Sequence, residues 1–381
     1  MKVLGSIARA LAYGLTRILP KSQTAILRGF PSYEDNLIAI YCALSVRHID
    51  RIVWVVNDLS VEPPVPLSPN TRLVKRGSVQ DFYYSMTSRF LFITHGHFLR
   101  NTPSNQICIN LWHGIPFKAI GKTQGREGRS DTFLIATSDF TRNIFAQAFG
   151  TDKERIIITG QARTDRMLAV VREEIWDRAF PGTPLPKKIF FWLPTFRQTP
   201  HFEGHSDGSL FDNVFNCSDF SETAFNEALK EQNAVCLVKP HPMAARKSMA
   251  DRSNIRYINE DWLLARRLSL YELVGATDCL ISDVSSIIAD FMLLDRPIIL
   301  LFEDILAYAS NRGFSFNPIT DYLPANVARN FEDFMTELRA VLGDQDNYAS
   351  KRAELRHLFF DHLDAGASDR ILDHVMGAKR R

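Results

Sequence analysis

The chain has 381 residues, a formal net charge of +2 at pH 7 and a hydrophobic fraction of 45%. A chain of this length is more often built as two domains than around one core, and its apolar fraction is that of a globular protein. The near balance of charge argues against a nucleic-acid partner. The five cysteines are scattered without a CxxC pair. Structural zinc and a disulfide framework are therefore disfavoured, and a reducing cytosol is indicated.

Residues 1–21 are predicted to form an amphipathic helix that associates with a membrane. Apolar side chains recur at steps of three and four and so share one helical face: Leu4, Ile7, Leu11, Leu15 and Ile18. Basic side chains fall on the other side: Lys2, Arg9 and Arg17. Such a helix can lie in the interface of an anionic membrane, although an ordinary docking helix remains the alternative. A signal peptide is disfavoured because charges interrupt the apolar part.

The rest of the chain alternates short apolar runs with helical patterns. Strands are predicted first at Arg51–Val56, Thr71–Lys75, Arg89–Thr94, Ile107–Leu111, Asp131–Ala136 and Arg155–Thr159. A second series is predicted at Lys188–Leu193, Ala234–Lys239, Ile255–Ile258, Asp278–Ser282 and Pro297–Leu301. Helical patterns lie between several of these strands, as at Asp35–Arg47 and Ser138–Phe149. This alternation is typical of parallel sheets covered by helices.

The two series of strands predict an α/β protein with two doubly wound domains facing a central cleft. The proline-rich stretch Phe180–Lys188 separates the series and is predicted to be a linker. We expect the amphipathic helix at 1–21, an N-terminal domain at 22–180, a C-terminal domain at 181–345 and C-terminal helices at 346–381. Ligands of such sheets bind beyond the carboxyl ends of the strands. The residues that directly follow each strand are therefore the candidates for function.

Polar side chains follow these strands at five places. They are His113 with Gly114, then Arg163, then Thr195 with Arg197, then His241 with Arg246, and finally Asp283 with Ser285 and Ser286. Ser285 and Ser286 precede an amphipathic helix, whose free N–H groups and positive end favour phosphate. Alternatively, Asp283 or Ser285 serves only as a helix cap. Lys239 and Arg246 add positive charge near His241, so an anionic ligand is predicted.

The order of these motifs resembles the CDP-glycerol glycerophosphotransferase family, whose members prime and polymerise teichoic acids and related capsules. The resemblance rests on WHG with the following Pro116 and Lys118, on HP at 241–242, and on SDVSS followed by DRPIILL and NRGFSF. It extends from YEDN at Tyr33–Asn36 through GQARTDRML at 160–168 to Arg312. The resemblance implies the GT-B fold, with 22–180 as the acceptor domain and 181–345 as the domain for the CDP donor.

The resemblance also implies a reaction and the residues that perform it. An acceptor hydroxyl would attack the β-phosphorus of CDP-glycerol, and CMP would leave. His113 corresponds to the general base, a role that suits the pKa of an imidazole. His241 is the second catalytic histidine and would hold the pyrophosphate together with Arg246. The remaining expected donor-side residues are Lys239, Asp283, Ser285, Ser286, Thr195 and Arg197. Asp35, Gly114 and Lys118 are expected on the acceptor side.

The expected partners are CDP-glycerol and an undecaprenyl-linked or polymeric acceptor, at an anionic membrane surface on the cytoplasmic side. No metal and no further cofactor is expected. The acidic Asp344–Asp346 follows a glycine and precedes a helix, which favours solvated carboxylates over metal ligands. Three other functions stay open: a CDP-ribitol-dependent transferase, a GT-B glycosyltransferase that uses a nucleotide sugar, and a non-catalytic nucleotide-binding protein. For His113 itself, a buried histidine with a structural role is the alternative.

Overall fold

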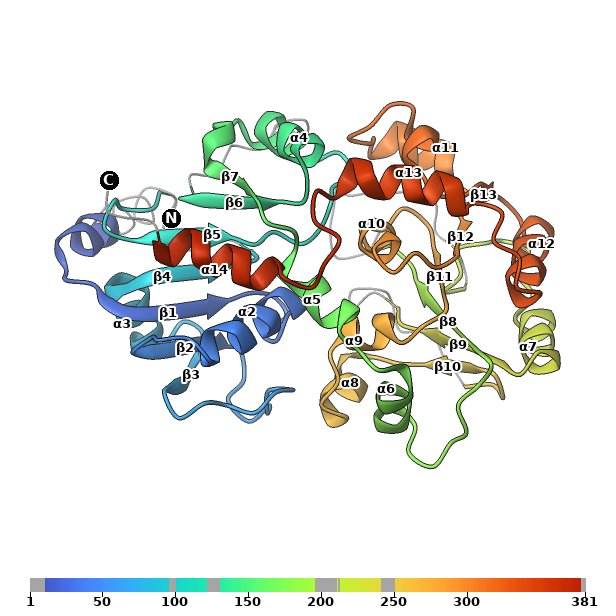
Figure 1. Ribbon diagram of the computed structural model, residues 1–381, viewed down its shortest axis with the longest axis horizontal. Coiled ribbons are helices and arrows are strands. Elements are labelled where there is room, and N and C mark those ends of the chain that lie inside the picture. Colours follow the sequence, from blue (N-terminus) through green and yellow to red (C-terminus); the bar gives the residue numbers. More distant parts are fainter. Residues whose placement is uncertain are drawn as a thin grey trace. The chain divides into compact units, whose positions relative to one another are not determined.

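The computed structural model describes residues 11–95, 101–121, 131–195, 211, 213–240 and 251–377. The chain divides into two units, whose helices and strands are labelled in Figure 1 and coloured in chain order. Unit 1 consists of Met1–His113, Gly121–Ala169 and Phe360–Arg381, and unit 2 consists of Gly114–Ile120 and Val170–Phe359. Within the described ranges, no helix combines the length and hydrophobicity needed to cross a membrane.

Unit 1 is built on a parallel sheet, which has seven strands in the described ranges and the order β3-β2-β1-β4-β5-β6-β7. The strands are β1 Ser22–Arg28, β2 Arg51–Val56, β3 Thr71–Lys75, β4 Ser88–Ile93, β5 Ile107–Asn110, β6 Phe133–Ala136 and β7 Ile156–Ile158. The helices are α2 Asp35–Ser45, α3 Val79–Thr87, α4 Asp139–Phe149, α5 Ala162–Leu168, α14 Ala367–Gly377 and the short 3₁₀ helix Lys153–Arg155. Residues 11–18 are also helical.

Unit 2 is built on a second parallel sheet, with six strands among the described residues in the order β10-β9-β8-β11-β12-β13. The strands are β8 Lys188–Leu193, β9 Ala234–Val238, β10 Ile255–Tyr257, β11 Cys279–Ser282, β12 Ile298–Leu301 and β13 Val327–Ala328. The helices are α6 Arg172–Ala179, α7 Glu222–Glu231, α8 Glu260–Ala265, α9 Leu270–Gly275, α10 Ile287–Met292, α11 Ile305–Asn311, α12 Phe331–Leu342, α13 Ala349–Phe359 and the 3₁₀ helix Ile319–Tyr322.

Both sheets have the strand order of a doubly wound fold. Counted within each unit, the first six strands of unit 1 and all six of unit 2 follow the order 3-2-1-4-5-6. That order reverses direction between β1 and β4 in unit 1 and between β8 and β11 in unit 2. Such switch points are where open α/β sheets bind their ligands. The predicted fold class of two doubly wound parallel sheets is therefore confirmed.

Local sequence signals explain where several helices begin. Ser138 accepts from the backbone N–H of Thr141, whose side chain reaches back to the backbone of Ser138, which is a complete capping box at the start of α4. Ser269 and Glu272 make the same arrangement at α9. Helix α4 ends at Gly150, whose φ of 60° is easily reached only without a Cβ atom. These caps satisfy backbone groups that the helices themselves leave unpaired.

Strand β1 is an interior strand of the unit 1 sheet, between β2 and β4, yet the apolar pattern did not predict it. Its apolar core is only Ala25–Leu27, and Arg28 follows directly. Arg28 is nevertheless 7% exposed, because its guanidinium donates to the buried carboxylate of Asp81 and to the hydroxyl of Ser85 at 3.2 Å. A buried ion pair thus fills a strand position that hydrophobic patterning treats as exposed.

The two units differ from the predicted domain boundaries in three places. Helix α6 belongs to unit 2, where Arg172 pairs with Asp278 at 2.9 Å and Arg178 pairs with Glu272 at 3.4 Å. The predicted C-terminal helices at 346–381 divide between the units, because α13 belongs to unit 2 and α14 to unit 1. Gly114–Ile120 belongs to unit 2 although it directly follows His113 of unit 1. The unit to which each segment belongs depends on tertiary contacts, which the order of the residues does not reveal.

Candidate active site

The turn that carries His113 has an unusual backbone. It follows β5, and the residues on both sides of His113 have positive φ angles, 54° at Trp112 and 122° at Gly114. Glycine tolerates this region, but a bulky residue such as tryptophan adopts it only where the surroundings enforce it. Such outliers gather at functional sites. His113 itself is exposed, so this turn presents the imidazole instead of burying it.

Two asparagines fix the strained backbone of Trp112. Asn110, the last residue of β5, accepts the Trp112 N–H through Oδ1 at 2.9 Å and donates to Asp131 Oδ2 at 2.8 Å. Asn36, in the first turn of α2, donates through Nδ2 to the Trp112 carbonyl at 3.4 Å. The indole packs edge-on against Phe149 of α4, with ring centroids 4.8 Å apart. These polar and apolar contacts together stabilise the unfavourable φ angle of Trp112.

Glu34 supports the same region through its contacts with Asn36. It caps α2 by accepting the backbone N–H groups of Asn36 at 3.0 Å and Leu37 at 3.4 Å, and it accepts the Asn36 side-chain amide at 2.9 Å. The backbone N–H of Arg163 donates to Asn36 Oδ1 at 3.1 Å. Burial raises the pKa of Glu34 to about 7, against the opposing charge of Arg163. A carboxyl group that titrates near neutral pH is a frequent mark of a functional site.

A row of aromatic rings lies at the carboxyl ends of three neighbouring strands. The His113 ring is stacked on Trp112, with centroids 4.1 Å apart and planes at 26°, and on His95, with centroids 5.1 Å apart and planes at 10°. His95 follows β4, and Phe30 after β1 meets it edge-on at 6.1 Å. Since β1 and β4 flank the switch point of unit 1, His95 and Phe30 lie where this class of sheet binds ligands.

In unit 2, Thr195 and Asp283 join the two strands that flank the switch point. Asp283 follows β11 and is completely buried. Its carboxylate accepts the Thr195 N–H at 3.0 Å, the Thr195 hydroxyl at 2.8 Å and the Val284 N–H at 2.7 Å. Both residues were predicted to bind the donor directly. Their mutual contacts give them a further role, which is to fix the loops after β8 and β11 against each other.

Ser285 and Ser286 precede α10, and neither side chain caps that helix. Within the described part of the chain, neither hydroxyl makes a side-chain hydrogen bond, and both residues are half-buried. The alternative of a simple helix cap is therefore disfavoured for both serines. Helix α10 is only six residues long, so the hydroxyls carry the argument for an anion here, and the helix dipole does not. Lys239 is buried and pairs with Glu260 at 3.2 Å, which offsets its charge.

The other predicted site residues divide between the units or lie outside the described ranges. Asp35 is the first residue of α2. Gly114 and Lys118 lie in unit 2, where Lys118 forms an antiparallel bridge to Phe314 and its ammonium group lies 5.7 Å from the Tyr308 ring centroid. His241, Arg246 and Arg197 lie outside the described residues. Sequence reasoning missed Glu34, Asn36, His95, Asn110 and Trp112. The signal was present for Glu34 and Asn36, which lie in the YEDN motif, and for Trp112, which lies in the WHG motif two residues after Asn110.

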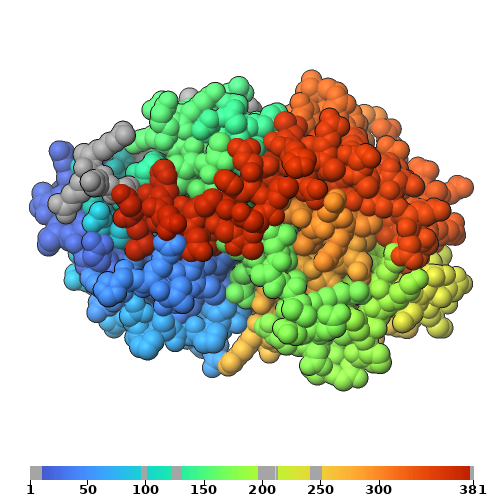
Figure 2. Space-filling model, viewed as in Figure 1, coloured from blue at the N-terminus to red at the C-terminus, as the bar shows by residue number. Residues whose placement is uncertain are grey.

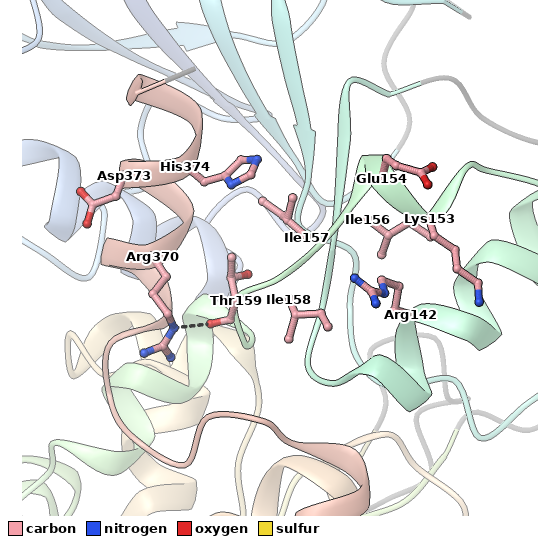
Figure 3. A pocket seen from close by; sticks show the side chains of 10 residues that line it. All are labelled: Arg142, Lys153, Glu154, Ile156, Ile157, Ile158, Thr159, Arg370, Asp373 and His374. Atoms are coloured by element: carbon pink, nitrogen blue, oxygen red, sulfur yellow. Dashed lines mark hydrogen bonds between the residues drawn. The ribbon is translucent and has the colours of Figure 1, made fainter. Parts of the chain in front are cut away.

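Two cavities of unit 1 contain none of the predicted site residues. One, of about 510 Å³, lies at the edge strand β7 and is lined by Arg142, Ile157, Thr159, Arg370 and His374 among others (Figure 3). The Arg370 Nε donates to the Thr159 carbonyl at 2.9 Å, as the dashed line in Figure 3 marks. The other, of about 1460 Å³, lies at the amino-terminal ends of the strands, beside residues 18–21 and Arg89. Neither lies beside His113.

Solved structures place the fold in the GT-B-like class. The wall teichoic acid polymerase TagF superposes with a TM-score of 0.76 at 22% identity, over 97% of this chain and 92% of that one. A UDP-GlcNAc 2-epimerase from Neisseria meningitidis superposes with a TM-score of 0.55 at 10% identity, over 93% and 100% of the two chains. At these identities the likeness concerns the fold alone.

The sequence identifies the family. Residues 11–377 match the family described as CDP-Glycerol:Poly(glycerophosphate) glycerophosphotransferase, and the chain belongs to it. The teichoic acid glycerol-phosphate transferase of Staphylococcus aureus is 25% identical over 90% of both chains. The poly(ribitol-phosphate) polymerase of Bacillus spizizenii is 26% identical over 77% of this chain. The chain spans about half the length of that polymerase and of two ribitol-phosphate polymerases from Staphylococcus aureus. The predicted family is confirmed.

Proposed function

We propose that this protein transfers glycerol phosphate from CDP-glycerol to a hydroxyl group of an acceptor and releases CMP. The observation that carries the proposal is the exposed His113 on its enforced turn, in a chain that matches the glycerophosphotransferase family over residues 11–377. A histidine held at the carboxyl end of a doubly wound sheet suits proton transfer near neutral pH.

In the proposed reaction, a bond forms between the acceptor oxygen and the β-phosphorus of CDP-glycerol. The bond from that phosphorus to the bridging oxygen breaks, and CMP leaves with that oxygen. The acceptor proton passes to the His113 imidazole. The hydroxyls of Ser285 and Ser286 donate to phosphate oxygens, with His241, Arg246 and Arg197 as the expected cationic partners. Asp283 and Thr195 keep the serine-bearing loop in place through their contacts of 2.8–3.0 Å.

Donor competition tests this proposal. The protein is incubated with CDP-glycerol, CDP-ribitol or UDP-sugars and candidate acceptors, while release of CMP or UDP is measured. CMP release from CDP-glycerol that depends on the acceptor is expected. CDP-ribitol is the second candidate donor, because several relatives are ribitol-phosphate polymerases. Faster turnover of CDP-ribitol would reassign the donor, and UDP release alone would make the protein a glycosyltransferase. No release from any donor would contradict transferase activity.

We also propose that the reaction needs no divalent metal ion. Among the described residues, Asp344 pairs with Lys188 at 2.7 Å and Asp346 with Arg352 at 2.6 Å, so both carboxylates of the acidic DQD segment have cationic partners. Cys217, Asp219 and Glu303 form the candidate metal cluster of the described ranges. Burial raises the pKa of the Cys217 thiol, which favours the protonated form over a metal-binding thiolate. Activity abolished by a chelator and restored by magnesium would refute this proposal.

The place of work that we propose is the cytoplasmic membrane surface, reached through the N-terminal helix. Within residues 11–18, Thr16 is completely buried, while Leu11, Leu15 and Ile18 are 64%, 49% and 76% exposed. The helix thus turns a polar position inward and its apolar stripe outward, the reverse of a helix docked on a protein core. Leu4, Ile7, Lys2 and Arg9 lie outside the described residues. An outward apolar stripe fits peripheral attachment to an anionic membrane.

A further inference from the structure

We propose that His95 is a positioning residue for His113. In this role it fixes the plane of the His113 imidazole and disfavours a positive charge on both rings at the same time. The inference rests on the proposed function, because it assigns His113 the role of the base. The observation behind it is the stacking of the two imidazoles, whose centroids are 5.1 Å apart and whose planes differ by 10°.

The sheet brings the two histidines together. Strands β4 and β5 are parallel neighbours, and their last paired residues are Ile93 and Asn110. The Leu111 N–H donates to the Ile93 carbonyl at 2.7 Å, so the ladder continues one residue beyond β5. His95 and His113 therefore leave adjacent strand ends, two and three residues past the last pair. Neither loop needs to bend back across the sheet for the rings to meet.

His95 is itself held from two sides. The Thr94 hydroxyl lies 3.0 Å from His95 Nδ1, and Phe30 meets the ring edge-on. Gly29 lies so close that a Cβ atom there would sit 2.6 Å from the Thr94 hydroxyl oxygen, so only glycine leaves Thr94 undisturbed. This packing orients the His95 ring. A ring with a fixed orientation can in turn limit rotation of the imidazole stacked on it.

The stacking also couples the protonation of the two rings. A positive charge on one imidazole disfavours a second charge on its neighbour, so the pair titrates in two steps. At pH values between the two steps, one of the two rings is neutral. A general base must be neutral to accept a proton. Charged groups on the surrounding elements are Glu34, Arg76, Asp131 and Arg163, of which Arg163 acts electrostatically on Glu34. Glu34 accepts from Asn36, Arg76 donates to the Gly29 carbonyl, and Asp131 accepts from Asn110.

The coupling is tested by NMR titration of the ten histidine imidazoles in the resting full-length protein. His95→Phe keeps an aromatic ring but removes its titration, and His113→Phe does the same at the other position. In the wild type we expect the two rings to titrate in steps separated by about one pH unit or more. Each single variant should leave the remaining ring with one simple step. Identical His113 titration curves in the wild type and in His95→Phe would overturn the coupling.

The positioning is tested by the kinetics of acceptor-dependent CMP release. His95→Ala removes the stacked ring and should lower kcat by about tenfold to a hundredfold, as expected for a misplaced catalytic group, with KM for CDP-glycerol unchanged. His95→Phe should retain most of kcat but shift the acid limb of the pH profile. The exposed His48, altered to Ala, serves as the matched control and should behave as wild type.

If His95→Ala does not fold, Thr94→Val provides a milder test, because it removes only the hydroxyl that contacts His95. It should lower kcat by a smaller factor in the same direction. Wild-type kcat in both variants would overturn the positioning role. Failure of the proposed function looks different, since no donor would then release CMP while the NMR coupling persisted. Unchanged kinetics and uncoupled titrations in an active enzyme would defeat this inference alone.

Discussion

At the scale of single residues, the His113 turn shows how side-chain contacts override a backbone preference. Trp112 adopts a φ of 54°, which costs free energy in a β-strand exit. Asn110, Asn36 and two phenylalanines of α4 compensate that cost. The sequence motif WHG marks the position, and the supporting asparagines lie outside it. Sequence reasoning can therefore name the histidine, whereas the groups that orient it emerge only when distant segments meet.

Replacing His113 by Gln should lower kcat by about two to four orders of magnitude, as expected when a general base is lost. KM for CDP-glycerol should change little, because the expected donor contacts lie in unit 2. The measurement is acceptor-dependent CMP release under saturating donor, with His48→Gln as the exposed control. Turnover like that of the wild type would remove His113 from the mechanism.

Glu34 should make stability depend on pH. Its folded pKa of about 7 lies above the ordinary carboxyl value of 4.5, so the folded state binds the extra proton between these values. The stabilisation is complete below about 4.5 and is lost as the pH rises through about 7. Glu34→Gln does not titrate. Its melting temperature relative to the wild type should therefore rise by a few degrees between pH 5 and pH 8.

The comparison is made by thermal unfolding at several pH values, with Glu173→Gln as a control on an exposed helix position. A difference between Glu34→Gln and the wild type that stays constant across this range would contradict a raised pKa for Glu34.

At the scale of elements, most strands could be predicted from their local apolar runs, whereas β1 and β13 could not. Arg51–Val56 and Lys188–Leu193 match β2 and β8 in both bounds, because parallel strands buried on both faces are almost wholly apolar. Strand β1 escaped because Arg28 is buried through Asp81, and β13 escaped because it has two residues. The assignment of α14 to unit 1 also could not be predicted, since it depends on contacts between residues 202 to 326 positions apart.

Helix α14 belongs to the surface of unit 1, where it contacts α2 and α5; Figure 2 shows it in red against the blue of α2. Its first turn is held by Asp165 of α5, whose two carboxylate oxygens accept the N–H groups of Ala367 at 2.9 Å and Ser368 at 2.7 Å. Asp165 thus acts as a helix cap supplied from another part of the chain. This contact gives the aspartate of the GQARTD motif a structural role.

Asp165→Ala should release the first turn of α14 and destabilise unit 1 by about 1–2 kcal/mol, the range for a lost helix cap. Hydrogen exchange of the α14 amides should accelerate, while exchange in the unit 2 strands stays as in the wild type. Asp177→Ala on the exposed face of α6 is the matched control. Unchanged protection of α14 would show that its packing on α2 suffices without the cap.

At the scale of the whole molecule, the carboxyl ends of the strands carry different chemistry in the two doubly wound units. In unit 1 these ends carry His95, His113 and other aromatic rings, and in unit 2 they carry hydroxyl groups and the buried Asp283. The strand alternation predicted both sheets, because the pattern of apolar runs is a local property. The crossing of Gly114–Ile120 into unit 2 could not be predicted, because its contact with Gly313 and Phe314 is set by tertiary packing.

The N-terminal helix lets the proposed membrane attachment be tested without damage to the fold. Its end is fixed by Asn105, which donates to the carbonyls of Thr16 at 3.3 Å and Arg17 at 2.9 Å, so deleting residues 1–20 would also remove protein contacts. The combined change Leu11→Ser, Leu15→Ser and Ile18→Ser alters only exposed side chains. It should weaken binding to anionic vesicles on the order of 100-fold or more, because three apolar side chains lose their burial.

Vesicle sedimentation at low and high salt provides the measurement, with turnover on a short water-soluble acceptor as the check on folding. Wild-type binding should weaken with salt, since each basic residue contributes about 1 kcal/mol near an anionic surface. Turnover on the soluble acceptor should survive the triple change, while activity on a lipid-embedded acceptor falls. Serine at Leu59, Leu67 and Leu306, which are 51%, 39% and 71% exposed, controls for lost surface hydrophobicity. If the triple variant still sediments with anionic vesicles at low salt, this stripe is not the anchor and attachment lies elsewhere in the chain.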